Sequence, residues 1–138
     1  MHEWLAAAQQ LEELTDEAAE QFYTYAYAQY KFGNFPQAAE VFRLLCTRRP
    51  LEPRFWFGLG ASCQEAKDYR SALNAWAMTA LIDAKDPYPH FHAAECSVSL
   101  KNFKDAYLAL QEVDQRIGSE SRHPLHERVQ ILKQSWSL

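Results

Sequence analysis

Several features that mark other classes of protein are scarce or absent in this sequence. Four glycines and six prolines among 138 residues leave little room for a long flexible linker. The three cysteines are an odd number without Cys-x-x-Cys spacing, so they favour neither a disulfide framework nor a zinc knuckle, and a reducing compartment fits them best. No segment approaches the roughly 20 apolar residues of a membrane span. With 48% hydrophobic residues, the composition favours a single globular domain.

An excess of positive charge is also missing. The formal net charge is −4, whereas proteins that bind a phosphate backbone normally carry a clustered basic face. The N-terminus has no basic segment followed by an apolar run, the pattern of a secretory signal. We therefore expect no nucleic-acid partner, no insertion into a membrane, and a cytoplasmic location.

What the sequence does contain is an internal repeat. A turn, an aromatic residue and an alanine recur at intervals of 34 residues, as Gly33-Asn34-Phe35-x-x-Ala38, Lys67-Asp68-Tyr69-x-x-Ala72 and Lys101-Asn102-Phe103-x-x-Ala106. Small and bulky residues recur in the same register, as Ala26, Gly60, Ala94 and as Phe42, Trp76, Leu110. This is the period of the tetratricopeptide repeat, a hairpin of two helices. Small residues let the helices approach closely, and large apolar side chains fill the gap beside them.

We therefore predict an all-α fold, with three tandem tetratricopeptide hairpins forming a short superhelix. The chain is read as one domain, 1–138, divided into an N-terminal helix (1–18), three repeats (19–52, 53–86 and 87–120) and a capping helix (121–138). The expected helices are 3–14, 16–32, 35–48, 53–66, 69–83, 88–100, 103–117 and 124–136. Asn34, Asp68 and Asn102 are expected to cap the second helices of the hairpins. Leu125, Val129 and Leu132 are expected to cover the last repeat.

Motifs that carry chemistry have little support. Gly58-x-Gly60 lacks a third glycine and a preceding strand, so close helix packing is expected there and not a phosphate-binding loop. His90 and His92 are two residues apart on a helix and point in different directions, which disfavours a shared metal ion. No nucleophile motif stands out. We predict no catalytic residue, no metal and no cofactor, and hence not an enzyme.

One stripe of aromatic residues does suggest a binding surface. Tyr23, Tyr27 and Tyr30 are spaced i, i+4, i+7 and therefore share one face of a helix. Such a stripe could belong to the core, but other residues of this helix are assigned to packing, which favours a groove for an extended peptide. The inward positions on the concave face are Tyr23, Tyr27, Tyr30, Phe57, Ala61, Gln64, Tyr88, Phe91 and Glu95. Among these, Gln64 and Glu95 are expected to bind the main chain of the peptide.

Three segments also resemble a specific family, over about 16–117. They are Tyr23-x-x-x-Tyr27-x-x-Tyr30, Arg54-Phe55-x-x-Gly58-Leu59-Gly60-Ala61 and Phe91-His92-Ala93-Ala94-Glu95-Cys96, and they are similar to the class II chaperones of bacterial type III secretion systems. The resemblance implies a chaperone in the bacterial cytoplasm. Such a chaperone holds a segment of a hydrophobic translocator or effector in its groove and keeps it soluble and competent for export.

The resemblance also implies self-association through the N-terminal segment. Trp4, Ala8 and Leu11 form an apolar stripe there, so they are the expected interface of a homodimer. A second reading remains open, in which the chain is a regulatory or scaffolding tetratricopeptide adaptor that binds folded protein partners.

Overall fold

The computed structural model describes residues 14–118 and 122–138, and in these ranges the chain forms seven helices and no strand. The helices are α2 (Asp16–Lys31), α3 (Phe35–Arg48), α4 (Pro53–Glu65), α5 (Tyr69–Ile82), α6 (Tyr88–Ser99), α7 (Phe103–Ile117) and α8 (Pro124–Trp136). These bounds confirm the prediction for 16–136 to within one residue at each helix end. The helix expected at 3–14 lies outside the described residues.

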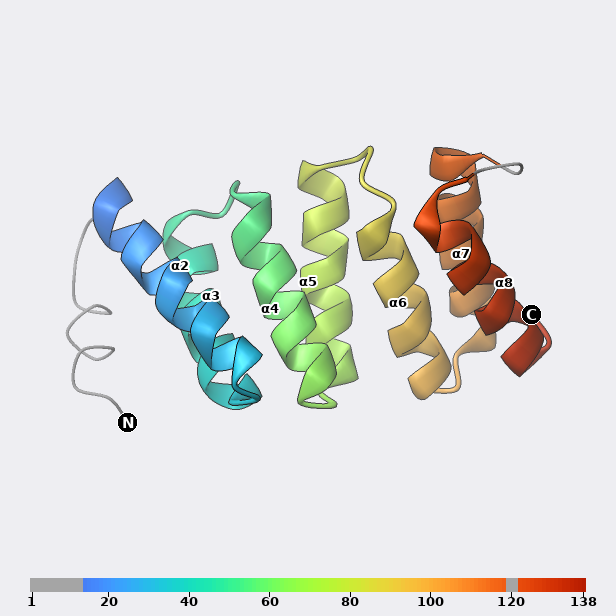
Figure 1. Ribbon diagram of the computed structural model, residues 1–138, viewed down its shortest axis with the longest axis horizontal. Coiled ribbons are helices and arrows are strands. Elements are labelled where there is room, and N and C mark those ends of the chain that lie inside the picture. The colour runs from blue at the N-terminus through green and yellow to red at the C-terminus, as the bar shows by residue number, and fades with distance from the viewer. Residues whose placement is uncertain (1–13, 119–121) are drawn as a thin grey trace.

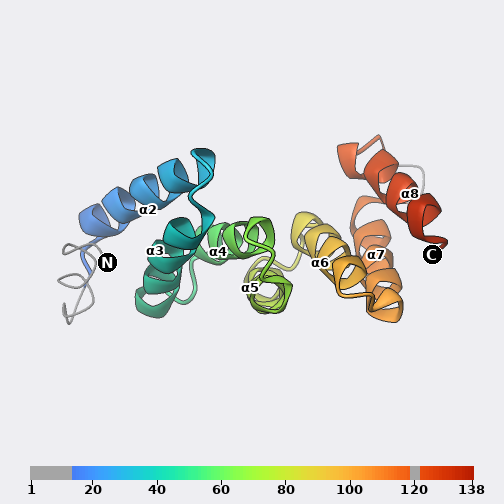
Figure 2. The same ribbon diagram turned by 90° about the horizontal axis from the view of Figure 1, so that it is seen from below.

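The helices stand side by side in chain order, as Figure 1 shows. Seen from below, α2, α4, α6 and α8 form one layer, and α3, α5 and α7 form the other (Figure 2). The two outer helices, α2 and α8, rise above α4 and α6, so the first layer is the concave face of a short superhelix. This arrangement confirms the predicted all-α tetratricopeptide fold.

Close approach of the paired helices depends on small residues at their crossings. Ala26, Gly60 and Ala94 are buried, as the register predicts. A Cβ atom at Gly60 would lie 2.8 Å from the indole of Trp76, and one at Gly58 would lie 2.3 Å from the ring of Phe42. Both distances are too short for carbon atoms in contact. The two glycines of Gly58-x-Gly60 therefore serve packing, as predicted.

The turns at the start of the second helices follow the predicted capping pattern in two repeats of three. The side chains of Asp68 and Asn102 accept hydrogen bonds from the backbone N–H groups of Ser71 and Asp105. The prediction is wrong for Asn34, whose side chain makes no capping bond and donates to Gln29 instead, at 2.8 Å. Proline at the second helical position removes one of the two N–H groups that a cap could satisfy.

The core consists of two clusters of buried residues. The larger runs through the first two hairpins around Phe42 and Trp76, both 1% exposed. The smaller lies between α6, α7 and α8 and includes Leu125 and Val129, which are fully buried, with Leu132 packed against it. The predicted inward stripe of the capping helix is therefore confirmed.

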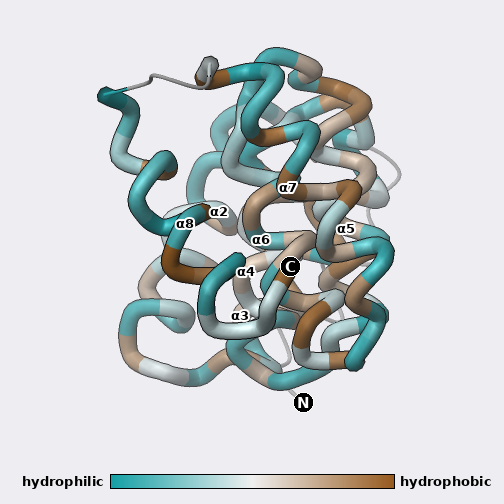
Figure 3. The backbone as a smooth tube through the Cα atoms, turned by 90° about the vertical axis from the view of Figure 1, so that its right-hand side faces the viewer, coloured by the Kyte–Doolittle hydropathy of each residue, from teal (hydrophilic) through white to brown (hydrophobic). Residues whose placement is uncertain are grey.

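Hydropathy along the helices fits this arrangement of the core. Hydrophobic and hydrophilic residues alternate along the backbone in Figure 3, as expected for helices that bury one face. Within the described ranges, no helix is both long enough and apolar enough to cross a bilayer.

Candidate functional site

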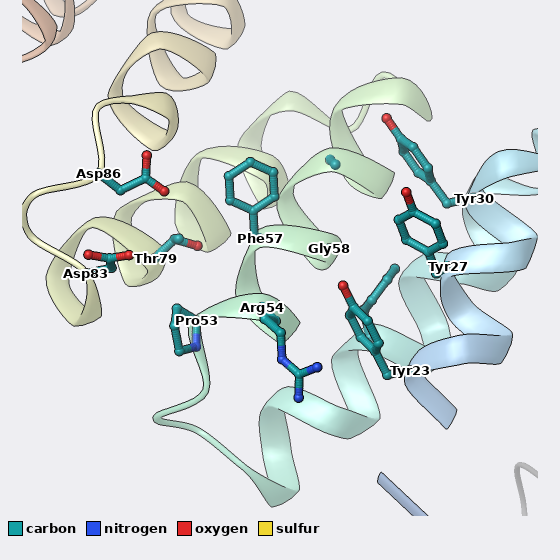
Figure 4. Close-up of a pocket in the computed structure, with 12 residues that line it drawn as sticks. Tyr23, Tyr27, Tyr30, Pro53, Arg54, Phe57, Gly58, Thr79, Asp83 and Asp86 are labelled. Carbon is teal, nitrogen blue, oxygen red and sulfur yellow. The ribbon is translucent and has the colours of Figure 1, made fainter. Parts of the chain in front are cut away.

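An open cavity of about 360 Å³ lies on the concave face, between α2, α4 and the end of α5. The residues that line it are Tyr23, Tyr27, Tyr30, Phe42, Pro53, Arg54, Phe57, Gly58, Ala61, Thr79, Asp83 and Asp86. Figure 4 shows the three tyrosines in a row along α2 on one side, Phe57 in the middle, and the two aspartates on the other side. Five of the predicted groove residues, namely the three tyrosines, Phe57 and Ala61, therefore meet in one pocket.

The three tyrosines differ in how far they are free to meet a ligand. Tyr27 is 48% exposed and stacks on Tyr23, with ring centroids 6.2 Å apart. Tyr23 itself packs against Phe42 and Phe55, at centroid distances of 6.0 and 5.7 Å. Tyr30 packs edge-on against the ring of Phe35. The expectation that none of the three tyrosines is needed for helix packing is therefore wrong. Tyr23 and Tyr30 also support the core, and only Tyr27 is mainly a surface residue.

On the α2 side of the pocket, the tyrosine phenols stay neutral and the guanidinium of Arg54 stays charged near neutral pH. Burial raises the pKa of Tyr23 and of Tyr30, so both phenols stay protonated near neutral pH and their hydroxyls can donate hydrogen bonds. The guanidinium of Arg54 lies 4.8 Å from the ring centroid of Tyr23. It also pairs with Glu20 and Glu52, and these hydrogen bonds raise the pKa of Arg54. Arg54 is therefore a fixed positive charge beside an aromatic face.

Gln64 and Glu95 do not line this pocket. The side-chain amide of Gln64 donates to Glu95 at 3.1 Å, and its oxygen accepts from the indole N–H of Trp76 at 2.9 Å. Glu95 also lies 2.7 Å from Nδ1 of His92, which stacks on Trp76. That these two side chains bind a peptide main chain stays a prediction, and both lie beyond the lining of the tyrosine pocket. Their hydrogen-bonding groups join α4, α5 and α6 to one another.

Phe91 and Tyr88 also lie apart from the pocket. Phe91 is only 3% exposed and belongs to the C-terminal core cluster, with the guanidinium of Arg128 4.5 Å from its ring centroid. Its assignment to the groove wall is wrong because α8 packs against α6 and covers it. Tyr88 is partly buried against the same cluster, and its ring lies 5.7 Å from that of His123.

Sequence reasoning missed several residues that complete the pocket. Arg54 and Gly58 occur in the second segment of the family resemblance, which was a usable signal. Thr79, Asp83 and Asp86 come from the end of α5 and the following loop. The repeat pattern did not predict that these three residues line the pocket, because only the stacking of one hairpin on the next brings them opposite α2.

Side chains with reactive or metal-binding potential are placed for structural roles. Cys46, Cys63 and Cys96 are free thiols in the core. Burial raises the pKa of Cys46 and of Cys96 to about 12, so these thiols stay protonated near neutral pH and are poor nucleophiles. In the part of the chain that the structure describes, no three histidine, cysteine or acidic side chains gather as metal ligands would. His123 caps α8 by accepting from the N–H of Leu125.

Comparison with protein families gives a match to the tetratricopeptide repeat over residues 19–50 and 53–86. Low calcium response locus protein H of Yersinia pestis is 38% identical over 86 residues, which make up 62% of this chain and 51% of that protein. The chain thus spans about half the length of the curated relatives that it matches first.

Solved structures match over nearly the whole chain. The type III secretion chaperone SycD of Yersinia enterocolitica, in complex with a peptide of the translocator YopD, is 30% identical with a TM-score of 0.81, covering 90% of this chain and 95% of SycD. PcrH of Pseudomonas aeruginosa, in complex with the chaperone-binding region of PopB, is 29% identical with a TM-score of 0.80, covering 88% and 99% of the two chains.

Proposed function

Because this chain belongs to the family of tetratricopeptide type III secretion chaperones, we propose that it holds an extended segment of a hydrophobic translocator or effector on its concave face. The family includes SycD, whose structure contains a translocator peptide. The observation that carries the proposal is the open pocket with Tyr27 on its wall, an aromatic side chain that is 48% exposed. An exposed aromatic ring in an apolar pocket offers a partner both contact area and a hydroxyl.

Holding such a client requires only differential affinity and no chemical step. Covering part of the client's apolar surface opposes its aggregation and leaves it competent for export. Three apolar anchors contribute about 1.5–3 kcal/mol each, and association and ordering of the peptide oppose binding, so an isolated segment is expected to bind with roughly micromolar affinity. Prolines would suit such a segment because they stiffen it before binding.

The setting proposed for this activity is the bacterial cytoplasm, where a client awaits export. We propose one domain over 1–138 with repeats at 19–52, 53–86 and 87–120, and a homodimer formed through Trp4, Ala8 and Leu11. These three residues lie outside the described residues, so the dimer rests on the sequence stripe.

The second candidate function is an adaptor for folded partners. The small size of the pocket favours the chaperone, because about 360 Å³ fits a few side chains of a peptide and not the face of a domain. Co-purification separates the two roles: a chaperone is expected to keep an otherwise insoluble partner in solution, whereas the partner of an adaptor is soluble alone.

The experiment that tests the proposal compares two tyrosines of similar exposure. Tyr27 lines the pocket, whereas Tyr107 lies on α7 outside it and is 44% exposed. Each is replaced by alanine, and a labelled peptide with prolines about five residues apart and a leucine between them is titrated by fluorescence anisotropy. We expect Tyr27→Ala to weaken binding tenfold or more, about 1.4 kcal/mol, and Tyr107→Ala to leave it unchanged. Equal affinities for wild type and both variants would show that the peptide binds elsewhere.

A further inference from the structure

The two sides of the pocket on the concave face differ in charge. Asp83 directly follows α5 as its C-cap, and Asp86 lies in the loop to α6; both line the pocket on the side away from the tyrosines (Figure 4). Neither carboxylate forms an ion pair with any residue that the structure describes. One side of the pocket is therefore aromatic, and the other carries two negative charges that form no ion pair within the described residues.

The loop holds these two carboxylates in place. The backbone N–H of Asp86 donates to the carbonyl oxygen of Asp83 at 3.2 Å. One carboxylate oxygen of Asp86 accepts from the backbone N–H of Tyr88 at 2.9 Å and so fixes the start of α6. Among the described residues, no hydrogen bond or ion pair involves the other carboxylate oxygen of Asp86 or either carboxylate oxygen of Asp83.

Positive charges near the pocket do not balance this acidic side. Arg54 is held by Glu20 and Glu52, so the three groups together are negative. Lys31 stands 5.2 Å from the ring centroid of Tyr27, on the α2 side of the pocket. Lys85, between the two aspartates in sequence, is exposed and is not a lining residue. Arg116 donates to the carbonyl oxygen of Ala84, between the two aspartates, but its charge is paired with that of Glu112. The groove therefore favours a cation on its α5 side.

We propose that the bound client segment carries a lysine or arginine next to one of its apolar anchors, and that Asp83 and Asp86 select it. The inference rests on the proposed function, since it concerns the client of the same pocket. An extended chain points successive side chains in different directions, so an anchor against the tyrosines leaves its neighbour facing the aspartates. Exposed ion pairs are individually weak, so the two carboxylates together are expected to change affinity by about threefold to tenfold at low ionic strength.

The test uses three labelled peptides that share the proline and leucine anchors and differ at one position beside the leucine, which is lysine, glutamine or glutamate. Each is titrated by anisotropy against wild type and against the double variant Asp83→Asn, Asp86→Asn. Asparagine keeps an oxygen that can accept from Tyr88. The matched control is Glu40→Gln with Glu127→Gln, which changes the net charge equally but lies outside the pocket.

We expect wild type and the control variant to bind the lysine peptide most tightly and the glutamate peptide most weakly. In the asparagine variant the three affinities are expected to converge. Added salt is expected to lower the affinity of the wild type for the lysine peptide more than its affinity for the glutamine peptide. This measurement needs no variant.

Two results would overturn the inference: equal affinities for the three peptides in wild type, or a lysine preference that survives in the asparagine variant. If the glutamine peptide binds wild type and loses affinity on Tyr27→Ala while charge has no effect, the inference fails and the proposed function stands. If no peptide depends on Tyr27, the proposed function itself fails.

Discussion

Gly58→Ala tests how tightly the first and second hairpins pack against each other at the pocket. Gly58 of α4 faces the ring of Phe42 of α3, and a Cβ atom there would lie 2.3, 2.4 and 2.6 Å from three carbons of that ring. Carbon atoms in contact stand about 3.5–4.0 Å apart, so the ring must retreat by roughly 1.2 Å. Phe42 is 1% exposed and packs in the larger core cluster, although its ring also borders the pocket.

Two opposing effects set the expected magnitude of this change. Overpacking a core costs about 1–3 kcal/mol, whereas alanine stabilises a helix by about 0.5–1 kcal/mol relative to glycine. Because the clash involves three carbons of a ring that is packed in the core, we expect Gly58→Ala to lower the free energy of unfolding by about 1–2 kcal/mol. Urea denaturation followed by far-ultraviolet circular dichroism measures it.

A double-mutant cycle identifies the cause. In a Phe42→Leu background the ring is gone and the leucine methyl groups can rotate away. Gly58→Ala is then expected to be neutral or stabilising, which gives a coupling free energy of about 2 kcal/mol. An equal loss of stability in both backgrounds, or a gain in the wild type, would refute the packing argument.

Two further predictions concern acid stability and self-association. Burial alone raises the pKa of Glu95, but the hydrogen bond with His92 and further polar contacts outweigh it and hold the pKa below its usual 4.5. The stabilisation of the fold by ionised Glu95 is therefore complete above pH 4.5 and is lost as the pH falls through the lower pKa of the folded state. In urea titrations at several pH values, we expect the free energy of unfolding of Glu95→Gln to fall less on acidification than that of the wild type. An unchanged dependence on acid would contradict this. If the N-terminal stripe is an interface, Leu11→Asp is expected to convert a sedimenting dimer to monomer because an unpaired charge resists burial, and a wild-type monomer at tens of micromolar would remove the interface.

Local signals explain why the helices and their pairing could be predicted from the sequence. Proline begins α4 and α8, and Gly118 ends α7 with a φ of 84° that glycine adopts without strain. The 34-residue register placed Ala26, Gly60 and Ala94 at the crossings, because only small residues permit that approach. These features depend on a residue and its near neighbours, so the order of residues alone determines them.

Which of the predicted groove residues line the pocket depends on contacts between helices far apart in sequence. Phe57 and Phe91 occupy the same repeat position, yet Phe57 lines the pocket and Phe91 is buried, because α8 follows the last hairpin and packs on α6. Tyr23 and Tyr27 share one face of α2, but Phe42 and Phe55 from other helices contact only Tyr23. The sequence by itself determined the helices, their hairpins and the face that carries the tyrosines. Tertiary structure alone decided which of those side chains are exposed and that two aspartates lie opposite them, because burial and proximity arise from the stacking of one hairpin on another.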